Sequence, residues 1–183
     1  MYEFIPQKTN QTARKLILLF FAGAAALFAL TLLVPAIPFR WVFQLFALAL
    51  LTAAIFLVTR YVTKLYIYRT EPTAGGAVDL TVTEAAANGK RAVTVCRIGL
   101  SQIRHRRLVS SQTEFDAALK ELKKERIRLY DYTVDLHPTE SILLLAEEGG
   151  ETLALRLAYD QTLFELLTPT ESDPSDTAEG EDA

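Results

Sequence analysis

The chain has few of the residues from which metal and catalytic sites are commonly built. Among 183 residues there are one cysteine and two histidines. The single cysteine, Cys96, excludes an intramolecular disulfide and a zinc site made of cysteines. His105 and His137 fall on different expected elements, without His, Cys or carboxylate neighbours at metal-ligand spacing. The glycine pairs 75–76 and 149–150 lack the spacing and lysine of a phosphate-binding loop. We therefore expect no metal, no cofactor, no small-molecule substrate and no catalytic residues.

Charge is absent from two long stretches, residues 16–34 and 41–59. At 1.5 Å per residue each makes a helix of about 28 Å, against a hydrocarbon core of about 30 Å. Backbone groups in lipid must be satisfied within the segment, so such stretches are helical. We predict a transmembrane hairpin over residues 15–60. Because neither stretch holds an ionisable residue, the pattern argues against ion transport by this chain alone.

The flanks of these stretches predict the orientation. A signal peptide is disfavoured, because the first stretch exceeds the usual apolar region of roughly 7–15 residues and a second follows at once. Basic residues favour the cytoplasmic side. The outer flanks carry three each and the connecting loop one: Lys8, Arg14 and Lys15; Arg60, Lys64 and Arg69; Arg40. We predict a multi-pass protein of the cell membrane (plasma or inner), with both termini in the cytoplasm and residues 1–14 as a cytosolic lead-in.

Small residues follow one surface of each predicted helix. Small side chains let backbones approach closely, which favours helix association in lipid. The candidate helix-packing residues are Ala22, Gly23, Ala26, Ala49 and Ala53. They could pack within the hairpin or against another subunit, and the sequence leaves both open.

The charges divide sharply along the chain. Residues 1–128 hold 18 basic and 8 acidic residues, whereas residues 129–183 hold 1 and 14. This places the basic half beside the membrane. Residues 169–183 are acidic, with no apolar side chain larger than that of alanine or proline, and are predicted to form a disordered tail.

Between the hairpin and the tail, alternation and helical spacing predict a β-rich domain over residues 61–168. Asn88-Gly89 is a strong hairpin signal, and Ser111 with Glu114 fits a helix capping box. The expected strands are 61–69, 78–83, 91–98, 130–136, 142–146 and 153–157, and the expected helices are 113–126 and 160–167. Six or seven antiparallel strands of this length would form a curled two-sheet barrel.

This order resembles the bacterial pleckstrin-homology-like (PH-like) families that carry such a domain on a two-helix membrane anchor. The resemblance is carried by the strand 61–69, by Val95-Cys96-Arg97-Ile98 and by the closing run 141–167. It covers about residues 41–168, and the charged helix 113–126 departs from it. It implies an α+β membrane protein: a transmembrane α-helical hairpin, then a PH-like split barrel with a mid-domain helix and a C-terminal helix.

A basic cluster is the best candidate for a binding site. It consists of Arg104, His105, Arg106 and Arg107. Arginines bind phosphates in bidentate fashion, so the cluster could contact anionic lipid or a protein partner. The alternative is an ordinary solvated loop. Nucleic acid is disfavoured, because no aromatic residues interleave with the arginines.

The resemblance and the membrane hairpin together imply a non-catalytic binding or adaptor protein at the cytoplasmic membrane surface. Its partners would be the bilayer and a protein or a second copy of the chain. The alternative is an accessory subunit of a larger membrane transporter or envelope complex, assembled through its helices.

Overall fold

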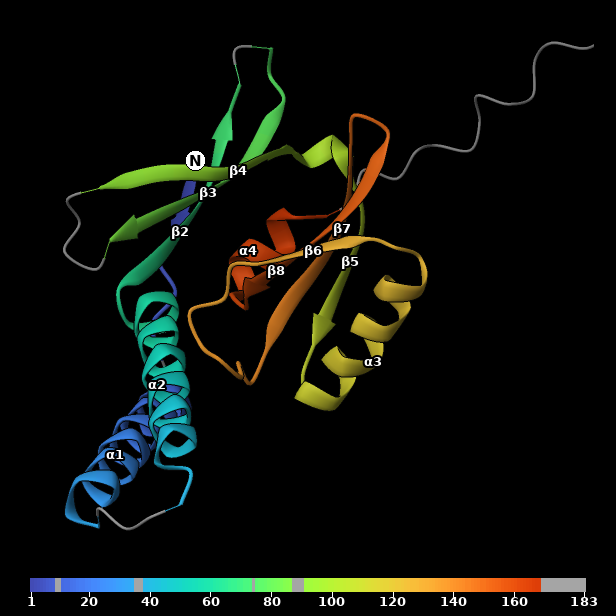
Figure 1. The fold of residues 1–183 in the computed structure, drawn as a ribbon. Coiled ribbons are helices and arrows are strands. Elements are labelled where there is room, and N and C mark those ends of the chain that lie inside the picture. The colour runs from blue at the N-terminus through green and yellow to red at the C-terminus, as the bar shows by residue number, and fades with distance from the viewer. Residues whose placement is uncertain (9–10, 35–37, 74, 87–90, 169–183) are drawn as a thin grey trace, which may run out of the picture.

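The structure is a computed structural model that describes residues 1–8, 11–34, 38–73, 75–86 and 91–168. Two long apolar helices lead into two four-stranded sheets and two shorter helices, which confirms the α+β class (Figure 1). The predicted acidic tail and the Asn88-Gly89 turn lie outside the described residues.

The two long helices form an antiparallel hairpin, α1 (Thr12–Leu33) and α2 (Arg40–Leu57). The second continues as a π-helical turn, Val58–Val62. With this turn the helices have 22 and 23 residues, and both are long and apolar enough to cross a membrane. Only 17% and 11% of their most apolar windows are buried in the protein. A core helix of a soluble protein would be largely buried, so this apolar exposure favours a lipid environment.

The second helix extends further along the chain than expected, into the residues whose alternation predicted a strand over 61–69. The amide of Thr63 donates to the carbonyl of Val58 at 3.1 Å, and strand β2 (Lys64–Pro72) begins one residue later. The predicted strand start at Tyr61 is therefore wrong. Continued helix keeps the backbone polar groups satisfied where the chain would leave a bilayer.

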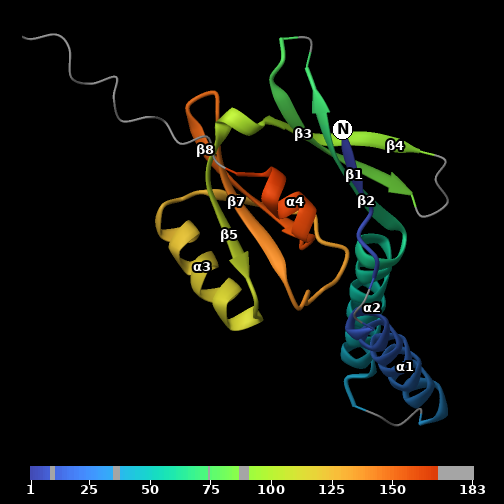
Figure 2. The same ribbon diagram turned by 180° about the vertical axis from the view of Figure 1, so that it is seen from behind.

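Sheet A has the order β1-β2-β3-β4. Strands β3 (Val78–Ala86) and β4 (Ala92–Gly99) form the expected antiparallel pair, with a register shift between Val82 and Thr83. Strand β1 (Tyr2–Phe4), which was not predicted, pairs with β2. The N-terminal segment thus belongs to sheet A and is more than a lead-in to the first helix (Figure 2).

Sheet B has the order β5-β7-β8-β6 and is mixed. Strands β5 (Ile103–Val109), β7 (Ser141–Glu148) and β8 (Glu151–Ala158) are antiparallel neighbours, but β6 (Arg128–Asp131) runs parallel to β8. The expectation of antiparallel strands alone is therefore wrong. Helix α3 (Gln112–Lys124) is the crossover between β5 and β6, and a crossover helix returns the chain in the same direction.

The expected strand over residues 130–136 ends early. The carboxylate of Asp131 accepts hydrogen bonds from the Thr133 amide at 2.9 Å and from its hydroxyl at 2.7 Å. This side-chain turn competes with strand pairing, as Asp side chains commonly do. Residues after Asp131 therefore leave the sheet and cross toward the hairpin (Figure 1).

Sheet B is covered on both faces. Alternate side chains of β7 pack against α3 (Leu143) or into the core between the sheets (Ile142 and Leu144). The short helix α4 (Gln161–Leu166) closes this inter-sheet core, with Leu163 fully buried. Two covered faces explain why β7 is a continuous apolar run.

Tyr68 joins the two sheets at the centre of this core. Its ring is fully buried, and its hydroxyl donates to the carbonyl of Tyr132 at 2.9 Å and accepts from the Ala158 amide at 3.2 Å. Burial raises the pKa of Tyr68 well above its usual value, so the hydroxyl is neutral at physiological pH and available for both bonds.

We expect Tyr68→Phe to lower the free energy of unfolding by about 1–2 kcal/mol, because the partly buried Tyr132 carbonyl and Ala158 amide lose their hydrogen bonds to the hydroxyl. Urea unfolding of the detergent-solubilised protein, followed by circular dichroism, measures this. Tyr159→Phe is the matched control, since Tyr159 contacts Phe164 through its ring. Equal stability of the two variants would contradict the role given to the Tyr68 hydroxyl.

Candidate functional site: the junction between hairpin and domain

The predicted basic cluster lies on β5, the edge strand of sheet B, so the expectation of a loop at these residues is wrong. His105 is exposed on this strand. Each arginine has a partner within the protein. Arg104 pairs with Glu147 at 2.8 Å, and Arg107 pairs with Glu114 at 3.1 Å. Arg106 donates to the carbonyl of Phe164, and its guanidinium carbon lies 4.4 Å from the centroid of that ring.

These pairs give the cluster a structural role. The Glu114 carboxylate also accepts from the Ser110 amide, and this bond, with Arg107, holds its pKa below the usual range. Arg104 and Arg107 remain 58% and 53% exposed. Contact with lipid phosphates would compete with the existing ion pairs.

The candidate helix-packing residues divide between two surfaces. Gly23 lies inside the hairpin, where an added Cβ would lie 3.3 Å from Leu50 Cδ1. Ala53 is half-buried, whereas Ala22, Ala26 and Ala49 are exposed on the outside of the hairpin. The buried small residues at the helix contact are Ala24, Ala47 and Ala54.

Two apolar hollows lie along the hairpin. One, of about 700 Å³, is lined by residues of both helices that include Phe20, Ala49 and Phe56. The other, of about 410 Å³, includes Phe28 and Gln44. Of the exposed candidate alanines, Ala49 lines the first of these concave apolar surfaces, which lipid chains or another helix can fill.

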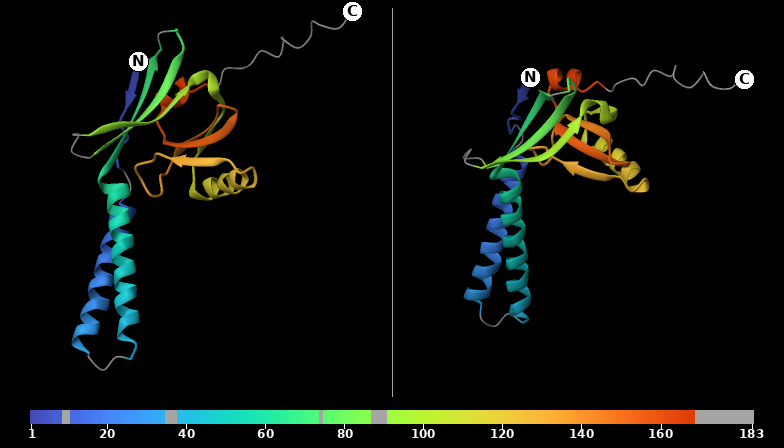
Figure 3. Two further views of the ribbon diagram at one scale, coloured as in Figure 1. Left: turned by 45° about the horizontal axis from the view of Figure 1, so that its top comes forward. Right: turned by 90° about the horizontal axis from the view of Figure 1, so that it is seen from above.

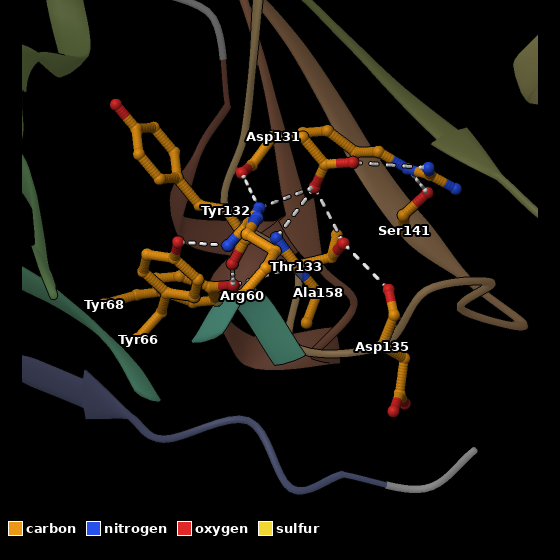
Figure 4. Close-up of polar contacts among 10 residues, drawn as sticks. Arg60, Tyr66, Tyr68, Asp131, Tyr132, Thr133, Asp135, Ser141 and Ala158 are labelled. Atoms are coloured by element: carbon orange, nitrogen blue, oxygen red, sulfur yellow. Dashed lines mark hydrogen bonds and ion pairs between the residues drawn. The ribbon is translucent and has the colours of Figure 1, made fainter. Parts of the chain in front are cut away.

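A polar junction that the sequence did not indicate joins the hairpin to the domain. Arg60, in the π-helical turn, donates to the Tyr66 hydroxyl and to the carbonyl of Asp131. Its guanidinium lies 4.0 Å from the Asp131 carboxylate and 5.2 Å from the centroid of the Tyr66 ring. Figure 4 shows Arg60 between Tyr66 and Asp131, with Tyr68 and Thr133 beside them.

Arg156 extends this junction into sheet B. Its side chain, on β8, is only 3% exposed and lies 3.6 Å from the other carboxylate oxygen of Asp131. Its Nε donates to the Ser141 hydroxyl at 3.1 Å, and its guanidinium carbon lies 3.5 Å from the centroid of Phe115 on α3. Burial lowers the pKa of Arg156, and the Asp131 carboxylate opposes that effect.

A continuous set of contacts therefore runs from the hairpin to α3, through Arg60, Asp131, Arg156 and Phe115. We call this set the arginine relay. One signal in the sequence could have pointed to it, because Arg156 is the only basic residue after position 128 and stands in an apolar strand. A lone charge at such a position is normally paired.

Charged side chains also gather where α3 ends. A hollow of about 660 Å³ is lined by Arg126, Arg128, Tyr130, Glu148 and Glu151, among others. Arg126 has a φ of 59°, in the left-handed region that glycine usually occupies after a helix. No ion pair joins the arginines and glutamates of this hollow within the part of the chain that the structure describes.

The structure places no metal-binding group in the described ranges, where three or more His, Cys, Asp or Glu side chains nowhere converge. Cys96 is partly buried on β4, and burial raises the pKa of its thiol to about 11. A thiol with this pKa is almost wholly protonated at neutral pH and is a poor nucleophile.

These features define an α+β protein with two helices able to cross a membrane, joined by partly buried charges to a two-sheet domain. Comparison of the chain with models of protein families, with curated proteins and with solved structures finds no match.

We expect Arg156→Met to destabilise the protein by about 2 kcal/mol, because the buried Ser141 hydroxyl loses its charged donor, while Asp131 keeps only Arg60 as an ion-pair partner. Urea unfolding in detergent measures the change. Arg104→Met, which breaks an exposed pair, is the control and should cost less than about 1 kcal/mol. A cost for Arg156→Met no larger than that of the control would show that the relay does not stabilise the packing of the hairpin and α3 on sheet B.

Proposed function

We propose that the chain is a non-catalytic, membrane-anchored binding protein that presents its β-rich domain at the cytoplasmic membrane surface. The hairpin is the anchor, and the domain is the adaptor that meets other membrane-bound proteins. Fixing a binding domain to the surface raises its effective concentration for such partners without any new contact.

One observation carries this proposal: the domain contacts both the segment before α1 and the segment after α2. Strand β1 precedes α1, strand β2 follows α2, and the two pair, with Glu3 opposite Arg69. Lys8, before α1, donates to the carbonyl of Val62 at 2.8 Å. Together with Arg60, these contacts hold the domain in one orientation above the hairpin, as a surface-presented binding domain requires.

The basic flanks support a cytoplasmic domain. The domain end of the hairpin carries Arg14 and Lys15 at the start of α1, Arg60 in the π-helical turn and Lys64 at the start of β2. Arg40 lies at the other end. Excess positive charge at one end favours the cytoplasmic side for that end.

A PH-like relationship remains part of the proposal. Two sheets enclose one core, and the C-terminal helix α4 packs into it, as the resemblance implies. The parallel pair of β6 with β8, and α3 packed on the outer face of sheet B, depart from an antiparallel barrel.

Membrane anchoring is tested with the full chain in native membranes. We expect the protein to resist extraction by alkaline carbonate, as an integral protein does. In a Cys96→Ser background, an impermeant thiol reagent applied to intact cells should label Phe39→Cys, in the exposed connection between the helices. Glu3→Cys and Glu165→Cys should react only after permeabilisation. Release by carbonate, or labelling of the terminal positions alone in intact cells, would overturn the proposed anchoring or its orientation.

The apolar hollows and the separate exposed alanines of the hairpin favour a second candidate function, an accessory subunit of a larger membrane complex. Ala26 is exposed on the outer surface, so Ala26→Leu adds bulk there without entering the contact between α1 and α2. If the helices assemble with another subunit, Ala26→Leu should dissociate a complex purified in mild detergent, measured by size-exclusion chromatography with light scattering. Leu18→Ala, at a position 62% exposed, is the control. An unchanged mass for Ala26→Leu would oppose assembly through this surface.

A further inference from the structure

The strongest unassigned surface of the domain is the basic end of α3. Five basic residues lie between positions 120 and 128, and all are exposed: Lys120, Lys123, Lys124, Arg126 and Arg128. Within the described ranges none of them forms an ion pair. They differ in this respect from Arg104 and Arg107 of the predicted cluster. Their charge is available to a partner outside the chain.

Helix α3 has one side committed to the protein and one side free. Phe115, Ala118 and Leu122 are buried against sheet B. On the opposite side of the helix lie Ala117, Lys120 and Lys124, which are exposed. The like charges of Lys120 and Lys124, four residues apart, repel one another unless an anion lies beside them.

The position of this free side relative to the hairpin indicates the partner. Figure 3 (left), in which the hairpin points downward, shows α3 below sheet B and level with the domain end of the hairpin. The arginine relay holds α3 there, because Phe115 contacts Arg156, which shares Asp131 with Arg60. A surface at this level would lie at the headgroups of a bilayer crossed by the hairpin.

The backbone at Arg126 adds an independent observation. A non-glycine residue in the left-handed region carries a conformational cost that glycine would avoid. Position 126 nevertheless keeps an exposed guanidinium, whose forked donors suit phosphate oxygens. A phosphate-binding role for this side chain would account for arginine at a position that favours glycine.

We infer that the basic end of α3 docks on the anionic headgroups of the leaflet from which the hairpin emerges. This inference rests on the proposed membrane anchoring. The domain is then held at two points, the hairpin and α3, and the Val78 end of sheet A, opposite the end at Lys64, lies away from the bilayer. Each basic residue near an anionic surface strengthens such docking by about fivefold, and salt weakens it.

The test uses the full chain in lipid nanodiscs, in a Cys96→Ser background. A fluorescent probe is attached through Ala117→Cys on the free side of α3, and quenching by spin-labelled headgroups is measured. The reference position is Val78→Cys, 36% exposed at the far end of sheet A. We expect quenching at position 117 to rise about twofold when zwitterionic lipid is replaced by a mixture with phosphatidylserine, and to fall at high salt. Position 78 should not respond.

Variants that remove single charges or pairs of charges test which basic residues produce the response to anionic lipid. Lys120→Gln with Lys124→Gln should remove the response to anionic lipid. Arg126→Gly should reduce it while leaving the melting temperature unchanged or raised, because glycine relaxes the backbone at this position. Arg104→Gln with Arg107→Gln is the matched control and should leave the response intact. Circular dichroism confirms that each variant is folded.

Two outcomes would overturn the inference: equal quenching at positions 117 and 78, or quenching at 117 that does not respond to lipid charge. Either would leave α3 as a surface for a protein partner. Failure of the anchoring proposal is distinguishable, because a chain without a membrane anchor would not enter the nanodiscs at all.

Discussion

The structure depends on one carboxylate shared by two arginines. Asp131 ends strand β6, and its side chain lies between Arg60 of the hairpin and Arg156 of sheet B. Arg156 is almost fully buried, and a buried guanidinium is tolerated only with a counter-ion and hydrogen-bond acceptors. Asp131 is the counter-ion, and the Ser141 hydroxyl is one of the hydrogen-bond acceptors. The same carboxylate turns the chain through Thr133, so one residue determines both the end of a strand and the attachment of the domain.

Two groups of basic residues that lie close together in the sequence have different surroundings in the structure. The arginines of β5 hold the strand to its neighbours, through Glu147, Glu114 and the carbonyl of Phe164. The basic residues at the end of α3 form no ion pair within the described ranges. A dense group of charges is therefore a weaker guide to binding than the presence or absence of partners for each charge. Sequence shows the density of charge, and only the fold shows the pairing.

Features set by local chemistry could be predicted from the sequence. The hairpin follows from apolar length, and α3 begins where predicted, because the Ser111 hydroxyl accepts from the Glu114 amide at 3.2 Å. Features that depend on distant partners could not. Strand β1 has three residues, too few for an alternation signal, and exists because β2 lies beside it. The residues after Asp131 alternate as a strand would, yet a side-chain turn removes them from the sheet.

The candidate sites follow the same division. The alanines and Gly23 were identified as small, but which of them face the hairpin contact depends on the helix rotation, and that rotation is a property of the packed pair. Arg60 reads in the sequence as one more basic flanking residue. Its contact with Asp131 spans 71 positions and required sheet B to bring the two together.

The pairing of β1 with β2 also determines when sheet A can form during synthesis of the chain. Tyr2–Phe4 is synthesised before both long helices, and its partner strand is synthesised after them. Sheet A therefore cannot close until the whole hairpin has been made and both of its ends lie on the same side. Under the proposed membrane anchoring, a chain with only one helix inserted would keep β1 and β2 on opposite sides of the bilayer, with an open strand edge in each compartment. Completion of sheet A would then require that both helices have been inserted.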